Sequence, residues 1–214
     1  MTTYANFVRD FPKRCKDLLD DYETDARGKD REVTLLIAVA TSAFTIPFER
    51  LRPSSTKHVA DDRSPEAVNE LDRLENRYFV DWQTRRGWMI IENLDGNVIR
   101  SSQADTWANP DQWRPIPANK TVRYVLNVLR NALAHGSIFT FPSSSSGKTP
   151  REIKRVVFLS RIRDKKTRDK KTRKLLDRYN AVIASPTDFR TLIFDWVSLL
   201  EGLPLPSEIK QENI

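Results

Sequence analysis

The alternation of apolar and polar positions predicts a chain made mostly of amphipathic helices. Apolar residues recur at intervals of three and four positions, which places them along one face of a helix. This spacing predicts helices over Tyr4–Tyr22, Arg31–Leu51, Ser64–Val80, Thr121–His135 and from Ser185 onward. The second of these stretches is apolar on nearly all sides, so we expect it to be the most buried element.

The stretch that ends at His135 has the best-defined apolar stripe. Its members are Val122, Val125, Leu126, Leu129, Ala132 and Leu133. Asn119 or Thr121 is expected to cap its start, and Gly136 its end. At about 100° per residue, Arg130 and His135 fall on opposite shoulders of the stripe, about 140° apart. Asn127 and Asn131 lie between them, on the face that we expect to turn away from the core.

Period-two patterns predict a smaller amount of β structure. The Asp95-Gly96 turn signal within Trp88–Ser101 predicts a β-hairpin. Ser137–Phe141 and Arg155–Leu159 are expected to form two further strands. Trp113 lies in a proline-rich loop, where it either stacks on unpaired bases or covers the edge of the hairpin and the start of the helix that ends at His135, and we favour the second. The predicted fold class is mainly α, a helical bundle with small β-hairpin insertions.

Composition limits the class of protein. The chain has 214 residues, of which 39% are hydrophobic and 30% charged, and its only cysteine is Cys15. No apolar run reaches the roughly 18 to 20 residues of a membrane span, and the start lacks the basic-then-apolar pattern of a secretory signal. We therefore expect a cytoplasmic protein that has no membrane association, no disulfide and no cysteine-based metal site.

Positive charge is concentrated in one segment. Between Arg151 and Arg178 there are thirteen Lys or Arg and four Asp or Glu, a surplus that exceeds the net charge of +7 of the whole chain. This segment contains a tandem repeat, Asp164–Arg168 and Asp169–Arg173. Its candidate RNA-backbone contacts are Lys165, Lys166, Arg168, Lys170, Lys171 and Arg173. The alternative is a solvated run of charge with no specific partner.

Arg130, Asn131 and His135 are the candidate catalytic residues. An arginine stays charged near neutral pH and can hold a phosphate, whereas an imidazole can gain and lose a proton there. Together they supply what phosphodiester cleavage without a metal requires. The alternative interpretation is that His135 binds the last carbonyls of its helix or simply lies on the surface.

The sequence from Arg130 to His135, Arg-Asn-X-X-X-His within an apolar helix, resembles the signature of the HEPN superfamily. Two further stretches resemble a bacterial plasmid- and genome-encoded HEPN subfamily. One is Arg31–Leu36 followed by Ile46–Leu51, and the other is a closing portion formed by Tyr179-Asn180, Ser185–Arg190 and Trp196. The resemblance implies an antiparallel four-helix bundle that dimerises, so that Arg and His of both subunits meet in one cleft. We accordingly expect one HEPN-like domain over residues 1–205, with an insertion at about 80–117, a basic β/helix segment at 137–178 and a flexible tail at 206–214.

The function implied by the resemblance is that of a metal-independent endoribonuclease acting as a toxin or a phage-defence effector. His135 would act as acid or base, Arg130 would stabilise the charge on the phosphate, and Asn131 would orient either His135 or the phosphate. Glu49 is a low-ranked accessory candidate whose alternative is a solvated turn or an ion pair. The expected partners are RNA, a second copy of the chain and a cognate antitoxin protein, with no cofactor or metal. One alternative is a catalytically inactive HEPN module that binds RNA or a partner protein, and another is a plain helical dimer in which Arg130 pairs with an acidic side chain.

Overall fold

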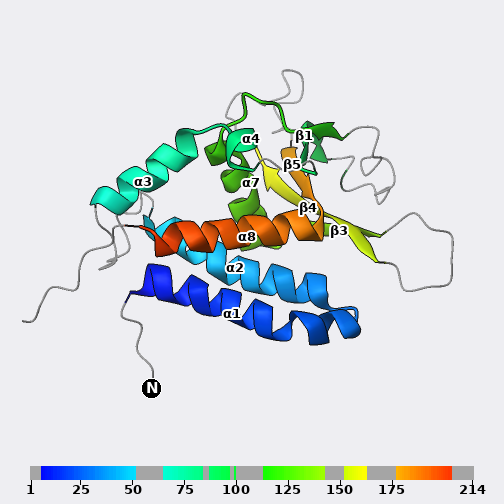
Figure 1. Cartoon of the computed structure of the whole chain (residues 1–214). Coiled ribbons are helices and arrows are strands. Elements are labelled where there is room, and N and C mark those ends of the chain that lie inside the picture. Colours follow the sequence, from blue (N-terminus) through cyan, green and yellow to red (C-terminus); the bar gives the residue numbers. More distant parts are fainter. Residues whose placement is uncertain are drawn as a thin grey trace, which may run out of the picture. The chain divides into compact units, whose positions relative to one another are not determined.

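The computed structural model describes residues 6–51, 65–83, 87–96, 99, 113–142, 152–162 and 177–203, which form six helices and a five-stranded sheet (Figure 1). The helices are α1 (Phe7–Gly28), α2 (Glu32–Leu51), α3 (Pro65–Asn76), α4 (Phe79–Trp82), α7 (Val122–His135) and α8 (Pro186–Glu201). The strands are β1 (Met89–Asp95), β2 (Arg114–Pro115), β3 (Ile138–Pro142), β4 (Ile153–Arg161) and β5 (Arg178–Ala184). The chain divides into a first unit, residues 1–77 with 189–214, and a second unit, residues 78–188.

The fold class predicted from the sequence is wrong. An extended antiparallel sheet in the second unit makes this an α+β protein and not a mainly α bundle with small hairpins. The strands of Ser137–Phe141 and Arg155–Leu159 were predicted correctly and pair as β3 and β4. The hairpin predicted within Trp88–Ser101 is wrong, because β1 pairs with β2 and β5, which lie far from it in the sequence, and Asp95, expected in the turn, pairs with Arg178 of β5.

In the first unit, α1, α2 and α8 lie side by side (Figure 1). The indole of Trp196 on α8 donates a hydrogen bond to the carbonyl of Ala43 on α2, at 3.1 Å, and its ring contacts Phe44 and Phe48. At the surface, Arg190 of α8 pairs with Asp20 and Glu23 of α1. Fully buried aromatic rings therefore hold this unit together, and exposed ion pairs add little to its stability.

The apolar character of α2 is explained by its burial. Its 20 residues are long and apolar enough to cross a membrane by length and composition alone, contrary to the expectation that no apolar run reaches that length. The core helix of a soluble protein passes the same test, and the buried residues of α2 are distributed along its whole length. They are Val33, Leu36, Val39, Ala40, Ala43, Phe44, Pro47, Phe48 and Leu51. The prediction that this stretch is the most buried element is not confirmed, because nine of its 20 residues are buried, against seven of 14 in α7.

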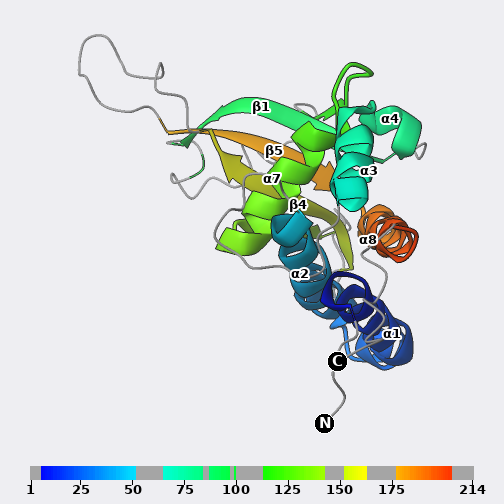
Figure 2. The ribbon, with the colours of Figure 1, turned by 90° about the vertical axis from the view of Figure 1, so that its left-hand side faces the viewer.

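In the second unit, the strand order is β2-β1-β5-β4-β3, and every neighbouring pair is antiparallel. α7 packs on β4 and β5 and crosses one face of the sheet (Figure 2). The opposite face carries a hydrophobic cluster that includes Val157, Leu159 and Ile183, with Trp113 and Phe141 packed against it at a ring separation of 6.2 Å. Trp113 therefore covers the sheet, as we favoured over base stacking.

Candidate functional site

The ends of α7 are fixed by the capping residues that the sequence predicted. The Thr121 hydroxyl accepts a hydrogen bond from the N–H of Tyr124 at 3.4 Å. At the other end, Gly136 adopts φ 65°, and the N–H of Ser137 bonds to the carbonyl of Ala132 at 2.9 Å. This left-handed glycine cap ends the helix directly after His135 and so determines where its imidazole emerges.

The buried side of α7 is slightly wider than predicted. All six residues of the expected stripe are buried, and Val128 joins them with 4% of its surface exposed. Val128 extends the stripe toward Asn131, because residues three positions apart lie next to each other on a helix. Residues on that shoulder of α7 therefore face the sheet.

Asn131 lies at this shoulder and links α7 to the sheet. Its Nδ2 donates to the Ser160 hydroxyl on β4 at 2.9 Å, and its Oδ1 accepts from Nη1 of Arg130 at 2.6 Å. Asn131 is half-buried, so its expected position on the face turned away from the core is wrong. The physical reason is that Ser160 offers a polar partner where the sheet meets the last turn of α7. Arg130 is half-buried beside it and is anchored through Asn131.

His135 is the last residue of α7, and its side chain is exposed. Within the described part of the chain it makes no hydrogen bond or ion pair that would hold it against the protein. The carbonyls of Ala132 and Leu133 are bonded by backbone N–H groups of the glycine cap, not by the imidazole. The interpretation of His135 as a capping side chain thus has no support, and its imidazole is accessible to a ligand.

The structure relates none of the remaining predicted site residues to this turn. Glu49 lies half-buried near the end of α2, in the first unit, whereas α7 belongs to the second. The six basic residues of the tandem repeat fall outside the described residues. Their assignment to RNA binding, like the catalytic roles of Arg130, Asn131 and His135, stays a prediction.

A second polar group on α7 was missed by the sequence analysis. Glu92 of β1 accepts hydrogen bonds from Nζ of Lys120 at 2.6 Å and from the hydroxyl of Tyr124 at 3.0 Å. Partial burial acts to raise the pKa of Glu92, but these hydrogen bonds and the charge of Lys120 lower it on balance. Burial, and then the bond to Glu92, raise the pKa of Tyr124. This cluster links the first turn of α7 to β1. The sequence alone does not indicate it, because Glu92 lies far from Lys120 and Tyr124 along the chain.

The sequence analysis also missed Ser160, although the pattern of apolar residues along β4 indicates that this serine is buried. Val156 and Phe158 alternate with Val157 and Leu159, and Ser160 is the next residue on the face that carries Val156 and Phe158. Only 7% of its surface is exposed. A serine that continues an apolar row in a buried strand requires a hydrogen-bond partner, which here is Asn131.

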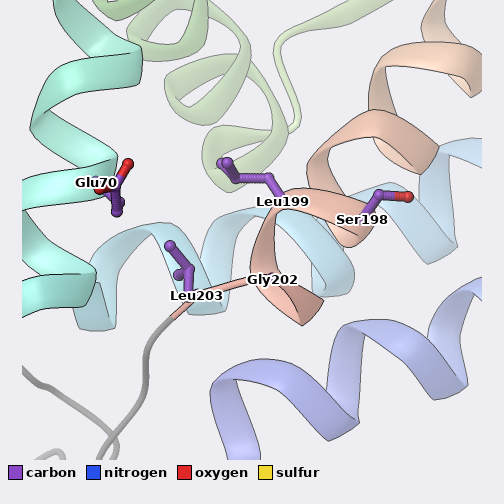
Figure 3. A pocket seen from close by; sticks show the side chains of 5 residues that line it. All are labelled: Glu70, Ser198, Leu199, Gly202 and Leu203. Carbon is purple, nitrogen blue, oxygen red and sulfur yellow. The ribbon is translucent and has the colours of Figure 1, made fainter.

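A separate hollow of about 440 Å³ lies in the first unit, at the C-terminal end of α8. It is lined by Glu70, Ser198, Leu199, Gly202 and Leu203 (Figure 3). None of the predicted site residues that the structure describes lines it, and Glu70 is paired with Arg73 on its own helix. Among the residues that the structure describes, no three His, Cys, Asp or Glu side chains gather where they could hold a metal ion. The last turn of α7 therefore remains the candidate site.

A protein-family model described as HEPN pEK499 p136 matches residues 1–203. No curated protein and no solved structure matches the chain. The match covers nearly the whole chain and confirms the resemblance to the HEPN superfamily.

Proposed function

Because the chain belongs to the HEPN pEK499 p136 family, we propose that it is a metal-independent endoribonuclease whose site is the last turn of α7. HEPN modules are generally ribonuclease-like or nucleotide-related, and the geometry of this turn favours the first of these. The substrate is RNA because the attacking group in metal-independent cleavage is the ribose 2′-hydroxyl, which DNA lacks.

The observation that supports this proposal most directly is the contrast between Arg130 and His135. Arg130 is half-buried and hydrogen-bonded through Asn131, as a residue that holds a phosphate in a fixed place should be. His135, five positions later, is exposed and makes no described hydrogen bond, as a residue that transfers protons to and from a substrate should be. A rigid cation beside an accessible imidazole suits phosphodiester cleavage.

In the proposed reaction, the imidazole of His135 takes the proton from the 2′-hydroxyl, whose oxygen attacks the adjacent phosphorus. The bond from phosphorus to the 5′-oxygen breaks, and this oxygen takes up a proton. The products are a 2′,3′-cyclic phosphate and a 5′-hydroxyl end. Arg130 stabilises the negative charge that develops on the phosphate, an effect often worth several kcal/mol. Asn131 orients Arg130.

Two proton transfers are needed, and the α7 turn of one chain contains one histidine. We propose that a second copy of the chain supplies the other imidazole, which makes the active enzyme a homodimer. In a cell this activity would degrade RNA as a toxin or as a phage-defence effector in the cytoplasm, and a cognate antitoxin protein would restrain it.

The test compares wild type with His135→Ala on end-labelled RNA in the presence of a chelator. We expect His135→Ala to lose roughly 10²- to 10⁴-fold in rate, the contribution typical of general acid–base catalysis. His58→Ala is the matched control, because His58 is the only other histidine of the chain, and it should retain full activity. RNA with a 2′-deoxy substitution at the cleaved position should resist cleavage, and light scattering should give twice the mass of one chain.

Unchanged cleavage by His135→Ala would exclude the acid or base role. If wild type binds several RNAs and cleaves none, the chain is instead a HEPN module that binds without catalysis, and Arg130 then serves only to hold the phosphate backbone. A monomer that cleaves RNA at full rate would contradict the shared site.

A further inference from the structure

We propose that Ser160 is a positioning residue for Arg130 and acts on it through the side-chain amide of Asn131. This inference rests on the proposed function in one respect, the assignment of Arg130 to the phosphate. Ser160 lies on β4, 29 positions from Asn131, and is not part of the Arg-Asn-X-X-X-His sequence.

The burial of Ser160 indicates that its hydroxyl is needed. On the face of β4 that carries Ser160, Val156 and Phe158 are fully buried, and Ser160 continues their row with 7% of its surface exposed. An alanine would fill nearly the same volume without placing an oxygen in the interior. A hydroxyl buried there costs free energy unless it is hydrogen-bonded, and the described bond is the one from Asn131.

The two hydrogen bonds of Asn131 depend on each other. A guanidinium has N–H donors and no acceptor, so the amide must turn its oxygen toward Arg130. Its NH₂ group must then point to the opposite side, where Oγ of Ser160 accepts at 2.9 Å. Ser160 thus fixes the NH₂ end of the Asn131 amide. The oxygen at the other end, Oδ1, accepts the hydrogen bond from Nη1 of Arg130 at 2.6 Å.

This arrangement has a consequence for catalysis. A bond from a charged donor is stronger than a neutral one, and its geometry determines where the guanidinium plane lies. Without Ser160 the amide of Asn131 loses the hydrogen bond that fixes its NH₂ end, and it then holds the guanidinium of Arg130 less precisely. The loss should appear in kcat, because the charge that Arg130 stabilises is greatest in the transition state.

The experiment uses the full-length protein with Ser160→Ala, Ser160→Thr and the matched control Ser137→Ala. Threonine keeps the hydroxyl and is well accommodated in a strand. Ser137 directly follows the cap of α7, and its hydroxyl makes no hydrogen bond in the described structure. Each variant is measured for RNA cleavage and, in ¹⁵N-labelled protein without RNA, for the resonances of the Asn131 amide and of Nε–H of Arg130.

We expect Ser160→Ala to lower kcat about tenfold, which corresponds to about 1.4 kcal/mol, while KM changes little. The Asn131 amide resonances should move, and the Arg130 resonance should move or broaden. Ser160→Thr should restore most of the rate and the spectrum, whereas Ser137→Ala should resemble wild type in both. If Ser160→Ala fails to fold, Ser160→Cys replaces it, since a thiol conserves the volume and accepts hydrogen bonds weakly.

Arg130 and Asn131 resonances that are the same in Ser160→Ala as in Ser137→Ala would overturn the inference. So would a loss of kcat that Ser160→Thr does not restore. If wild type cleaves no RNA, the proposed function fails, but the spectra still decide whether Ser160 positions Arg130.

Discussion

At the scale of single residues, the polar side chains of α7 are held by partners on the sheet. Asn131 near its end bonds to Ser160 of β4, and Tyr124 in its first turn bonds to Glu92 of β1. Both are half-buried side chains on the shoulder of an apolar stripe. A helical wheel assigns such positions to solvent, because it describes one helix without the surface on which it packs.

The Glu92 cluster predicts a pH-dependent contribution to stability. The folded state lowers the pKa of Glu92, so its stabilising effect is complete above the ordinary carboxyl pKa of about 4.3 and is lost as the pH falls through the lowered value. Glu92→Gln should therefore lower the melting temperature at pH 7, and the difference from wild type should begin to shrink near the ordinary carboxyl pKa and vanish only below the lowered pKa of the folded state. Its side chain is 37% exposed, which limits the effect to less than about 1 kcal/mol.

Thermal unfolding monitored by circular dichroism between pH 3 and pH 8 measures this difference. The control is Glu152→Gln, which removes a carboxylate whose ion pair with Lys154 is well exposed. A melting difference for Glu92→Gln that persists unchanged in acid would show that its charge is not what matters.

At the scale of elements, β5 decides the architecture of the second unit. It lies in the centre of the sheet, with Val182 between Ile90 of β1 and Phe158 of β4. The residues from Ala181 to Ala184 are all buried, so β5 shows a short apolar run and not the alternation of a half-exposed strand. The sequence analysis accordingly identified no strand there, and without β5 the other strands form only separate hairpins.

Substitution of Gly136 tests how the end of α7 is formed. A side chain at Gly136 meets no atom within 4 Å, so the cost of Gly136→Ala comes from its φ of 65° alone. We expect a loss of about 1 kcal/mol in the free energy of unfolding. Gly28→Ala is the matched control, because Gly28 also has open space around it but is helical with an ordinary φ. It should stabilise the protein by up to about 1 kcal/mol.

Chemical denaturation of both glycine variants gives the two free energies. Equal effects of the two substitutions would contradict the glycine cap as the determinant of where α7 ends.

At the scale of the whole molecule, the excess of positive charge and the candidate catalytic residues lie in different segments of the chain. The candidate catalytic residues are on α7, whereas the surplus of positive charge lies between Arg151 and Arg178. If the tandem repeat contacts the RNA backbone, it contributes affinity without determining the position of the cut. Binding and cleavage are then separable by mutation.

Salt dependence provides the test of this separation. Replacing Lys165, Lys166, Lys170 and Lys171 by Gln should weaken RNA binding and reduce the slope of log Kd against log salt by about 0.7 for each phosphate that the repeat no longer neutralises. Binding is measured by fluorescence anisotropy in the His135→Ala background, in which we expect no cleavage, from low to moderate salt. Lys13→Gln with Lys29→Gln, two exposed lysines of the first unit, is the control. A slope that changes equally in the control set would show that the repeat has no special role.

The sequence by itself determined the features that depend on neighbours along the chain. These are the caps of α7 at Thr121 and Gly136, its apolar stripe, and the spacing that places Arg130 and His135 in its last turn. Helix periodicity and capping act over three to five residues, so the sequence contains the whole cause. The motif also identified the superfamily, which the family match over residues 1–203 confirms.

Only the tertiary structure decided which segments pair and what the polar shoulder of α7 contacts. Met89 faces Ile183 across the sheet, and Asn131 meets Ser160 on another element. Such contacts depend on the burial of many residues at once and are not encoded in any short stretch. For that reason the sheet was underestimated and Asn131 was assigned to the wrong face, while the catalytic roles of Arg130, Asn131 and His135 stay predictions.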